Sequence, residues 1–296
     1  MRTKPAPPAI PDRTKPPTLF RETVGVLAKS RTAVAGAVII LVFSLFAIAA
    51  PLLSPHDPVA QVIADRLGPP FSSGHLLGTD ELGRDLASRI IYGARISMVI
   101  GLVSVGISLS LGLVIGTLCG YYGGWFDRIV MRLIDIMLAF PYILLTIVIV
   151  AILGSSLVNA MIAIGISQVP VYARVVRASV LAEKENDYVA AERSLGAGDL
   201  SLMAGTILPN CLAPIFVQAT LGIGDAILSS AALSFLGLGA KPPTPEWGLM
   251  IASAKEFVTS AWWVVTFPGI AILLTVLGFN LLSDSLRDAL DPRLKD

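Results

Sequence analysis

Residues 136–173 read IMLAFPYILLTIVIVAILGSSLVNAMIAIGISQVPVYA, a run of 38 positions without a charged side chain. A helix that crosses the hydrocarbon core of a bilayer needs about 20 mostly apolar residues, so this run is long enough to cross twice. The Gly154-Ser155-Ser156 sequence lies at its centre and favours a tight turn. The run therefore predicts two adjacent membrane-spanning helices, at about residues 136–153 and 157–176.

Four further stretches of the same character flank this pair. Residues 33–53, 96–126 and 257–283 carry no charge, and residues 200–240 are interrupted only by Asp225. The first stretch is too long for the apolar part of a signal peptide, and no small-residue cleavage site follows it, so we expect it to stay as an anchor. The sequence thus predicts an all-α integral membrane protein with six transmembrane helices.

The composition excludes several other classes of protein. Hydrophobic residues make up 54% of the 296 residues and charged residues 15%, whereas soluble domains average about 25% charged. The two cysteines, Cys119 and Cys211, lie in apolar runs and favour buried free thiols over a disulfide. A net charge of +1 gives no basic surface for nucleic acid. We therefore expect lipid, and no nucleic acid, as a partner.

The distribution of lysine and arginine predicts the orientation. With the N-terminus inside the cell, 16 of the 22 basic side chains fall on the cytoplasmic side, as the positive-inside rule requires. Both termini are then cytoplasmic. The predicted segments are a cytoplasmic tail (1–30), a first transmembrane helix (31–53), an extracytoplasmic segment (54–93), a five-helix core (94–286) that holds a cytoplasmic loop (183–200), and a cytoplasmic tail (287–296). Within the extracytoplasmic segment, residues 82–95 mix apolar and charged side chains at helical spacing and predict a helix lying along the outer membrane face.

Small residues recur at every fourth position of the second predicted span. They are Ser104, Ser108, Gly112, Gly116 and Gly120. Such a stripe lets another helix approach closely. Packing within the chain is the favoured interpretation, and a seam with a partner subunit is the alternative.

Few side chains in this sequence are suited to catalysis. No phosphate-binding Gly-rich loop with its lysine, no nucleophile elbow and no zinc-protease motif occurs. The two histidines, His56 and His75, lie in the predicted outer segment. A metal pair is one interpretation, but solvated side chains are favoured because no cysteine or carboxylate cluster is evident beside them. We therefore expect no enzyme activity and no cofactor or metal in this chain.

Asp225 is an ionisable residue inside a predicted span. A charge at the bilayer centre costs roughly 2.5–3.5 kcal/mol on insertion scales, so its side chain should face a bundle interior or a water-filled path. One interpretation is contact with a polar or cationic substrate along a translocation path that includes Asp225 and Ser229. The other is a structural carboxyl group hydrogen-bonded to backbone or hydroxyl groups, with Ser229 one turn away.

The loop between the fourth and fifth spans contains NDYVAAERSLG at residues 186–196. Asn186 or Asp187 is suited to cap a helix, and Gly196 to end it in a left-handed conformation. A helix of two turns is too short to be stable alone. Its paired alanines, Ala190 and Ala191, leave a flat face for a groove of another protein.

This segment resembles the EAA loop of ABC importer permeases, whose short coupling helix fits a cleft of the ATP-hydrolysing subunit. Gly196, Leu208 and Pro209 fall on the family's positions, as does Ala191. Two residues depart from the pattern: the carboxylate lies at Glu192 instead of position 190, and Thr206 replaces an isoleucine. The resemblance implies that ATPase coupling is carried by Asp187, Tyr188, Ala190, Ala191, Glu192, Arg193 and Gly196.

Further blocks resemble the dipeptide/oligopeptide/nickel branch of these permeases, and within it the second, "C"-type subunit. They are LGTDELGRD (77–85), YGARIS (92–97), LSFLGLG (233–239), PPTPEWG (242–248) and DSLRDALDPR (284–293). The resemblance implies the type I ABC importer fold of methionine permeases, in a bacterial inner membrane. It favours di- and oligopeptides as the solute, while nickel and glutathione importers share the same blocks.

The resemblance also implies the partners. They are two ABC ATPase subunits that hold ATP and Mg²⁺, a second homologous permease chain and an extracytoplasmic substrate-binding protein. Two other classes of function stay open. A channel or secondary transporter would need paired intramembrane charges or an ion site, and a structural scaffold would not need the 186–196 pattern.

Overall fold

A computed structural model of the chain describes residues 27–290, and every regular element in that range is a helix. The all-α class predicted from the sequence is therefore confirmed. The predicted N-terminal tail lies almost entirely outside the described residues, as do residues 291–296. The long helices are α2 (Arg31–Leu53), α3 (Leu86–Tyr122), α4 (Gly124–Ala139), α5 (Tyr142–Leu153), α6 (Leu157–Glu183), α10 (Leu212–Phe235) and α12 (Trp263–Leu290). The short elements are α7 (Asp187–Ser194), α8 (Asp199–Ser201), a π-helical turn (Leu202–Ile207), α9 (Leu208–Asn210), α11 (Trp247–Ala254) and 3-10 turns at Ile63–Asp65 and Lys255–Phe257.

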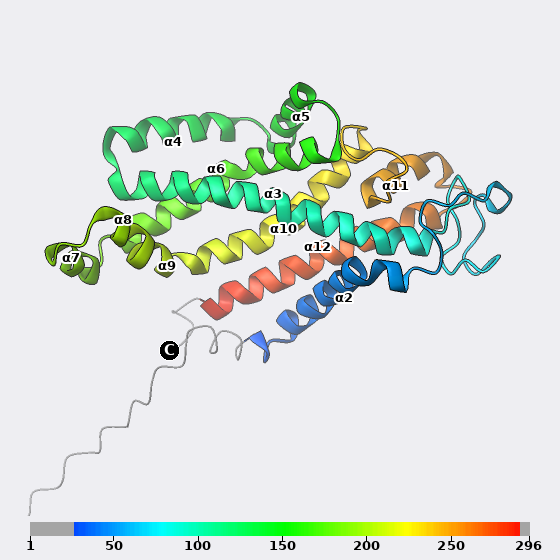
Figure 1. The fold of residues 1–296 in the computed structure, drawn as a ribbon, viewed down its shortest axis with the longest axis horizontal. Coiled ribbons are helices and arrows are strands. Elements are labelled where there is room, and N and C mark those ends of the chain that lie inside the picture. Colours follow the sequence, from blue (N-terminus) through cyan, green and yellow to red (C-terminus); the bar gives the residue numbers. More distant parts are fainter. Residues whose placement is uncertain (1–26, 291–296) are drawn as a thin grey trace, which may run out of the picture.

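Within residues 27–290, five helices are long and apolar enough to cross a membrane, namely α2, α3, α6, α10 and α12. Figure 1 shows that they run lengthwise through one elongated bundle. Helices α7, α8 and α9 lie at one end of the bundle, which we call the α7 end. The segment 54–85 and helix α11 lie at the opposite end, which we call the α11 end (Figure 1).

Helix α6 packs closely on the half of α3 that runs from Ser104 to Gly120. Ser104 Oγ and Ser108 Oγ of α3 donate hydrogen bonds to backbone carbonyls of α6, at 3.1 and 2.8 Å. A methyl group added at Gly112 or Gly116 would come within 2.4 or 2.6 Å of α6 atoms. The stripe of small residues is therefore a packing seam within the chain, and the favoured interpretation is confirmed.

The third predicted span is broken. The chain leaves the helix at Phe140, whose φ and ψ of −89° and 138° are extended, and helices α4 and α5 meet at 96°. Pro141 explains the break, because it lacks an N–H group and its ring pushes the preceding residue out of the helical region. The prediction of one straight helix at 136–153 was wrong. The described residues contain a sixth span only if α4 and α5 are counted together.

Helix α3 begins at Leu86, ten residues before the predicted span. Asp85 caps it by accepting a hydrogen bond from the Ser88 backbone N–H. The prediction of a separate helix along the outer face at residues 82–95 was wrong. The charged Arg89 in this part of α3 is buried, because it donates to the Pro58 carbonyl oxygen at 2.9 Å and lies 3.3 Å from the Asp80 carboxylate.

The last two predicted spans also have different ends. Helix α10 starts only at Leu212, after the π-helical turn and α9, and Pro214 in its first turn has no N–H to donate to the Asn210 carbonyl oxygen. Helix α12 continues to Leu290, so residues 287–290 are helical and the predicted tail begins too early.

Candidate functional site

Helix α7 has the bounds and the ending that the sequence indicated. It runs from Asp187 to Ser194 after Asn186. Gly196 has φ of +91°, a value that residues other than glycine rarely adopt, because they carry a Cβ atom. Its N–H donates to Arg193 O at 3.0 Å, and the Ala197 N–H donates to Glu192 O at 3.1 Å. This pair of bonds is the Schellman arrangement, which satisfies the last carbonyl groups of a helix.

One face of α7 is anchored and the other is free. Val189 is 1% exposed and packs in an apolar cluster with Val176 and Val180 of α6. Ala190, Ala191 and Gly196 are exposed, and Leu195 is 89% exposed. Among residues 27–290 nothing covers this outer face, so α7 presents a small apolar surface to a partner.

The two residues that depart from the EAA pattern are bonded to each other. Thr206 Oγ1 donates a hydrogen bond of 2.6 Å to Glu192 Oε2. Thr206 lies in the π-helical turn that leads into α9 and α10. The hydroxyl group thus ties α7 to the chain entering a membrane-spanning helix, a contact that an isoleucine at this position would not make.

Two other side chains of α7 also reach neighbouring elements. The Arg193 guanidinium lies over the Tyr121 ring, with its carbon 5.6 Å from the ring centroid, and donates to the Tyr121 hydroxyl at 3.3 Å. That hydroxyl donates to Asp199 Oδ1 at 2.6 Å. Asn210 donates to the Tyr188 hydroxyl at 3.3 Å. Tyr121 lies at the last turn of α3, so α7 is bound to both the seam helix α3 and the approach to α10.

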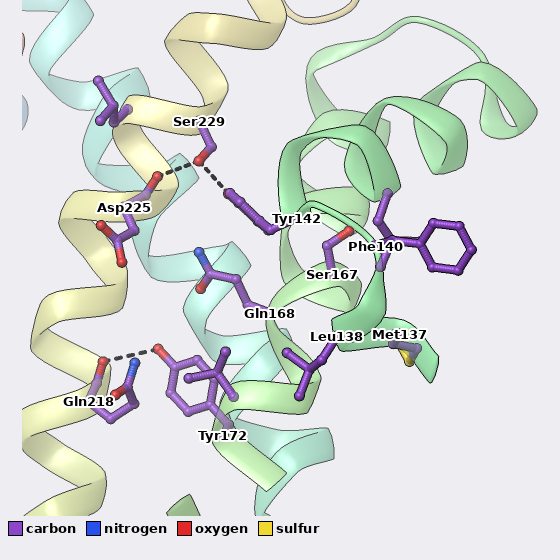
Figure 2. Close-up of a pocket in the computed structure, with 13 residues that line it drawn as sticks. Met137, Leu138, Phe140, Tyr142, Ser167, Gln168, Tyr172, Gln218, Asp225 and Ser229 are labelled. Carbon is purple, nitrogen blue, oxygen red and sulfur yellow. Dashed lines mark hydrogen bonds between the residues drawn. The ribbon is translucent and has the colours of Figure 1, made fainter. Parts of the chain in front are cut away.

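A cavity of about 380 Å³ opens between α6, α10 and the break between α4 and α5. Figure 2 shows Gln168 of α6 and Tyr142 from the break reaching towards α10, which carries Asp225 and Ser229. Apolar side chains form much of the remaining wall, together with Ser167, Tyr172, Gln218 and Ser229. The lining residues are Met137, Leu138, Phe140, Tyr142, Leu145, Ser167, Gln168, Val171, Tyr172, Gln218, Asp225, Leu228 and Ser229.

The Asp225 carboxylate faces this cavity. Ser229 Oγ donates to the backbone carbonyl oxygen of Asp225 at 2.6 Å, not to its carboxylate, and Ser229 also accepts a hydrogen bond from the Tyr142 hydroxyl (Figure 2). Among the described residues the carboxylate has no hydrogen-bond partner. The interpretation of Asp225 as a structural carboxyl group required hydrogen bonds to backbone or hydroxyl groups, and its carboxylate makes none there. Two more buried atoms of the cavity wall, Ser167 Oγ and Gln168 Oε1, also have no hydrogen-bond partner among the described residues. They are available to bind a polar solute.

The sequence did not identify several of these residues. Tyr142 enters the cavity because the chain breaks at Pro141, and that proline was the available signal in the uncharged run. Gln168 and Ser167 are polar residues in an apolar helix, which was the available signal. Tyr121 carries no signal in the sequence, because its partner Arg193 is 72 positions away.

The two histidines are not both solvated. His75 is 8% exposed, and its Nδ1 lies 2.8 Å from Asp85 Oδ1. His56 lies beside it, with ring centroids 4.7 Å apart. Burial of Asp85 opposes its ionisation, but hydrogen bonds from Ser88 and His75 outweigh burial and hold the pKa of this carboxyl below its ordinary value. Solvated side chains were therefore the wrong interpretation for His75, because the chain folds back and brings Asp85 to it. Cys119 and Cys211 are buried and free, as predicted.

Comparisons with known proteins agree with this architecture. Residues 112–296 match the family described as "Binding-protein-dependent transport system inner membrane component", and residues 18–70 match the "N-terminal TM domain of oligopeptide transport permease C". A di/tripeptide transport system permease protein of Pseudomonas aeruginosa is 50% identical over 95% of this chain and 94% of its own length. A glutathione transport system permease protein of Pectobacterium atrosepticum is 45% identical over 94% of this chain and 92% of its own.

The fold is also that of a solved importer. The structure of the methionine ABC transporter MetNI in inward-facing conformations superposes with a TM-score of 0.56, at 19% identity, over 70% of this chain and 98% of the matched chain. That identity is low, so this likeness concerns the fold alone. From its matched residues and its near full-length relatives, the chain is a member of the family of binding-protein-dependent transport system inner membrane components, a multi-pass permease of ABC importers.

Proposed function

We propose that this chain is one of two permease subunits of an ATP-driven importer of di- and oligopeptides. The observation that carries the proposal is 50% identity with a di/tripeptide permease over nearly the whole of both chains. Glutathione, itself a short peptide, is the alternative solute, supported by the relative at 45% identity. In either case ATP and its Mg²⁺ are held by separate ATPase subunits and not by this chain.

The orientation is part of the proposal. The α7 end faces the cytoplasm and the α11 end faces outward, because that placement puts 16 of 22 basic residues inside. The substrate-binding protein then docks at the α11 end, on the segment 54–85 and the loop around α11. The ATPase subunits meet α7.

The exposed face of α7 docks in a cleft of an ATPase subunit. Ala190 and Ala191 allow close approach, and Leu195, at 89% exposure, supplies apolar area to bury. Asp187, Tyr188 and Gly196 shape the two ends of the same helix. Closure of the ATPase pair around ATP then displaces α7 as a unit.

The inner face of α7 passes this displacement to the membrane helices. Val189 pushes on α6, and the Glu192–Thr206 hydrogen bond pulls on the approach to α10. Arg193 acts on α3 through Tyr121. Coupling is mechanical in this scheme, because the driving reaction takes place on another polypeptide.

The cavity lined by Asp225 is this chain's part of the translocation path. A carboxylate beside the unpaired Ser167 and Gln168 oxygens suits the ammonium group of a peptide, which donates three hydrogen bonds. Ser229 and Tyr142 hold the wall of the path in place. The second permease chain lies against the open side of the cavity and completes the path.

Substitution of Ala191 by arginine tests the coupling assignment. A long charged side chain on the exposed face prevents the helix from entering an ATPase cleft, so uptake by intact cells should be lost while the chain still inserts. Ala182→Arg is the matched control, because Ala182 is exposed on the last turn of α6, outside α7. The measurement is peptide uptake together with co-purification of the ATPase subunits.

The outcome also decides between classes of function. Normal uptake with Ala191→Arg would exclude α7 as the coupling element. Uptake that needs no ATPase at all would favour the channel or secondary transporter instead.

A further inference from the structure

Two imidazole rings and a carboxylate meet at the α11 end, outside the coupling helix and the cavity. The possible ligand atoms of His56, His75 and Asp85 all lie within 4.8 Å of one another. His75 Nδ1 is 2.8 Å and His56 Nδ1 3.7 Å from the same carboxylate oxygen, Asp85 Oδ1. One carboxylate oxygen is therefore approached by two ring nitrogens from different parts of the segment.

Hydrogen bonding accounts for only part of this arrangement. The His75–Asp85 contact is an ordinary hydrogen bond, whereas 3.7 Å is too long for one. Among residues 27–290 the ring nitrogens of His56 make no hydrogen bond, and its side chain is 43% exposed. The His56 ring thus approaches the pair without a hydrogen bond of its own, held by its backbone and by the neighbouring His75 ring.

The surroundings hold the carboxylate in one orientation. Asp85 Oδ2 accepts hydrogen bonds from the Ser88 N–H and Oγ, at 2.7 and 2.6 Å. Ser88 Oγ in turn accepts from the His56 backbone N–H at 3.0 Å. Ser88 thereby orients one ligand and fixes the backbone of another, and leaves Asp85 Oδ1 free to face the rings. Such outer contacts are a regular feature of metal sites.

We propose that His56, His75 and Asp85 bind a divalent transition-metal ion of the zinc class. Two imidazole nitrogens and one carboxylate oxygen suit zinc, nickel or copper, whereas calcium and magnesium prefer oxygen ligands throughout. Bonds of about 2.0–2.1 Å place tetrahedral ligands about 3.3 Å apart. The two separations from Asp85 Oδ1, 2.8 and 3.7 Å, lie on either side of that value, and all three ligand atoms lie within 4.8 Å of one another. Small side-chain rotations therefore complete the site.

The site has room for a fourth ligand. His75 and Asp85 are buried, at 8% and 2% exposure, while His56 closes the site from the solvent side. Water or a donor group from a docking protein fills the remaining position. The ion joins the residues just after α2 to the first turn of α3, so it fastens the chain at the α11 end.

The experiment uses the full-length chain, purified with its partner chains through an affinity tag without histidine. The protein is stripped with a chelator and titrated with Co²⁺, whose visible absorption reports four-coordinate nitrogen and oxygen ligation, and then with Zn²⁺ in competition. The chain contains two histidines in all. Loss of either therefore leaves a single imidazole, and no other histidine of the chain can replace it. The test variants are His56→Ala, which removes the exposed ligand, and His75→Gln, which retains a donor for Asp85.

The wild-type protein should take up one ion per chain with a tetrahedral cobalt spectrum, and each variant should bind Zn²⁺ more than tenfold more weakly. Asp57→Asn is the matched control, since Asp57 is an exposed neighbouring carboxylate outside the cluster, and it should bind like the wild type. Thermal unfolding of the metal-free proteins checks that the variants are folded. The proposal is overturned if the wild type shows no saturable binding, or if folded variants bind as tightly as the wild type.

Discussion

Asp225 places a carboxylate halfway along an apolar membrane-spanning helix, where it faces a cavity and not a partner side chain. An unpaired carboxylate in such surroundings is expensive. The presence of this carboxylate is explained if a cationic group of the solute pairs with its charge while the solute crosses the membrane. The rest of the cavity wall supports this interpretation, because Gln168 and Ser167 also present oxygen atoms without partners.

This compensation predicts the effect of Asp225→Asn. The amide keeps the size of the side chain but loses its charge, so uptake of a dipeptide with a free N-terminus should fall about tenfold, equivalent to about 1.4 kcal/mol. Uptake of the same dipeptide with an acetylated N-terminus should change little. The measurement is radiolabelled uptake at equal expression, with Asp225→Glu as the control that retains the charge. Equal losses for both peptides would contradict a role in binding the ammonium group.

Sequence reasoning at this scale found charged residues and missed neutral ones. Asp225 was identified because a single carboxylate stands out in an apolar run. Tyr142 and Gln168 were missed because their role depends on where the chain bends and which helices meet. The sequence raised the two histidines as a possible metal pair but missed their carboxylate, since Asp85 approaches His75 only through the fold of the loop.

At the scale of elements, local signals predicted helix α7 well and failed at helix breaks. Asn186 and Gly196 bracket α7 in the sequence and in the structure. The uncharged run 136–173 was divided only at its Gly-Ser-Ser centre, although Pro141 also ends a helix. The difference is physical, because hydropathy measures solubility in lipid and carries no information on backbone geometry.

The seam between α3 and α6 predicts a contrast between two glycines of one helix. Gly116→Ala should destabilise the protein, because its methyl group would lie 2.6 Å from the Ala173 carbonyl oxygen. Gly106→Ala should be neutral or stabilise by up to about 1 kcal/mol, because nothing lies within 4 Å of that position and alanine is the better helix former. Thermal unfolding in detergent measures both. A loss of stability at both positions would mean that the seam is not the cause.

At the scale of the whole molecule, the bundle has two ends of different chemistry, and the proposed orientation assigns them to opposite sides of the membrane. Leu195→Cys at the α7 end and Thr259→Cys at the α11 end introduce exposed thiols. In intact cells that lack the partner chains, an impermeant maleimide should label Thr259→Cys alone. Opening the cells should allow labelling of Leu195→Cys.

The native cysteines provide the background control, because Cys119 and Cys211 are buried. Labelling of Leu195→Cys before the cells are opened would reverse the orientation. The sequence predicts orientation through a bias in charge, which is a property of the whole chain and needs no knowledge of the contacts between helices.

Helix α3 is longer than the membrane is thick. Its 37 residues extend about 55 Å at 1.5 Å per residue, against about 30 Å of hydrocarbon. Glycine and serine contacts bind its half between Ser104 and Gly120 to α6, and at this length the helix can extend beyond the hydrocarbon core. A tilt of about 5° about a mid-membrane pivot moves each end by about 2 Å, in opposite directions, with every internal hydrogen bond intact. A displacement of α3 at one surface of the membrane would thereby move its other end at the opposite surface, without bending the helix.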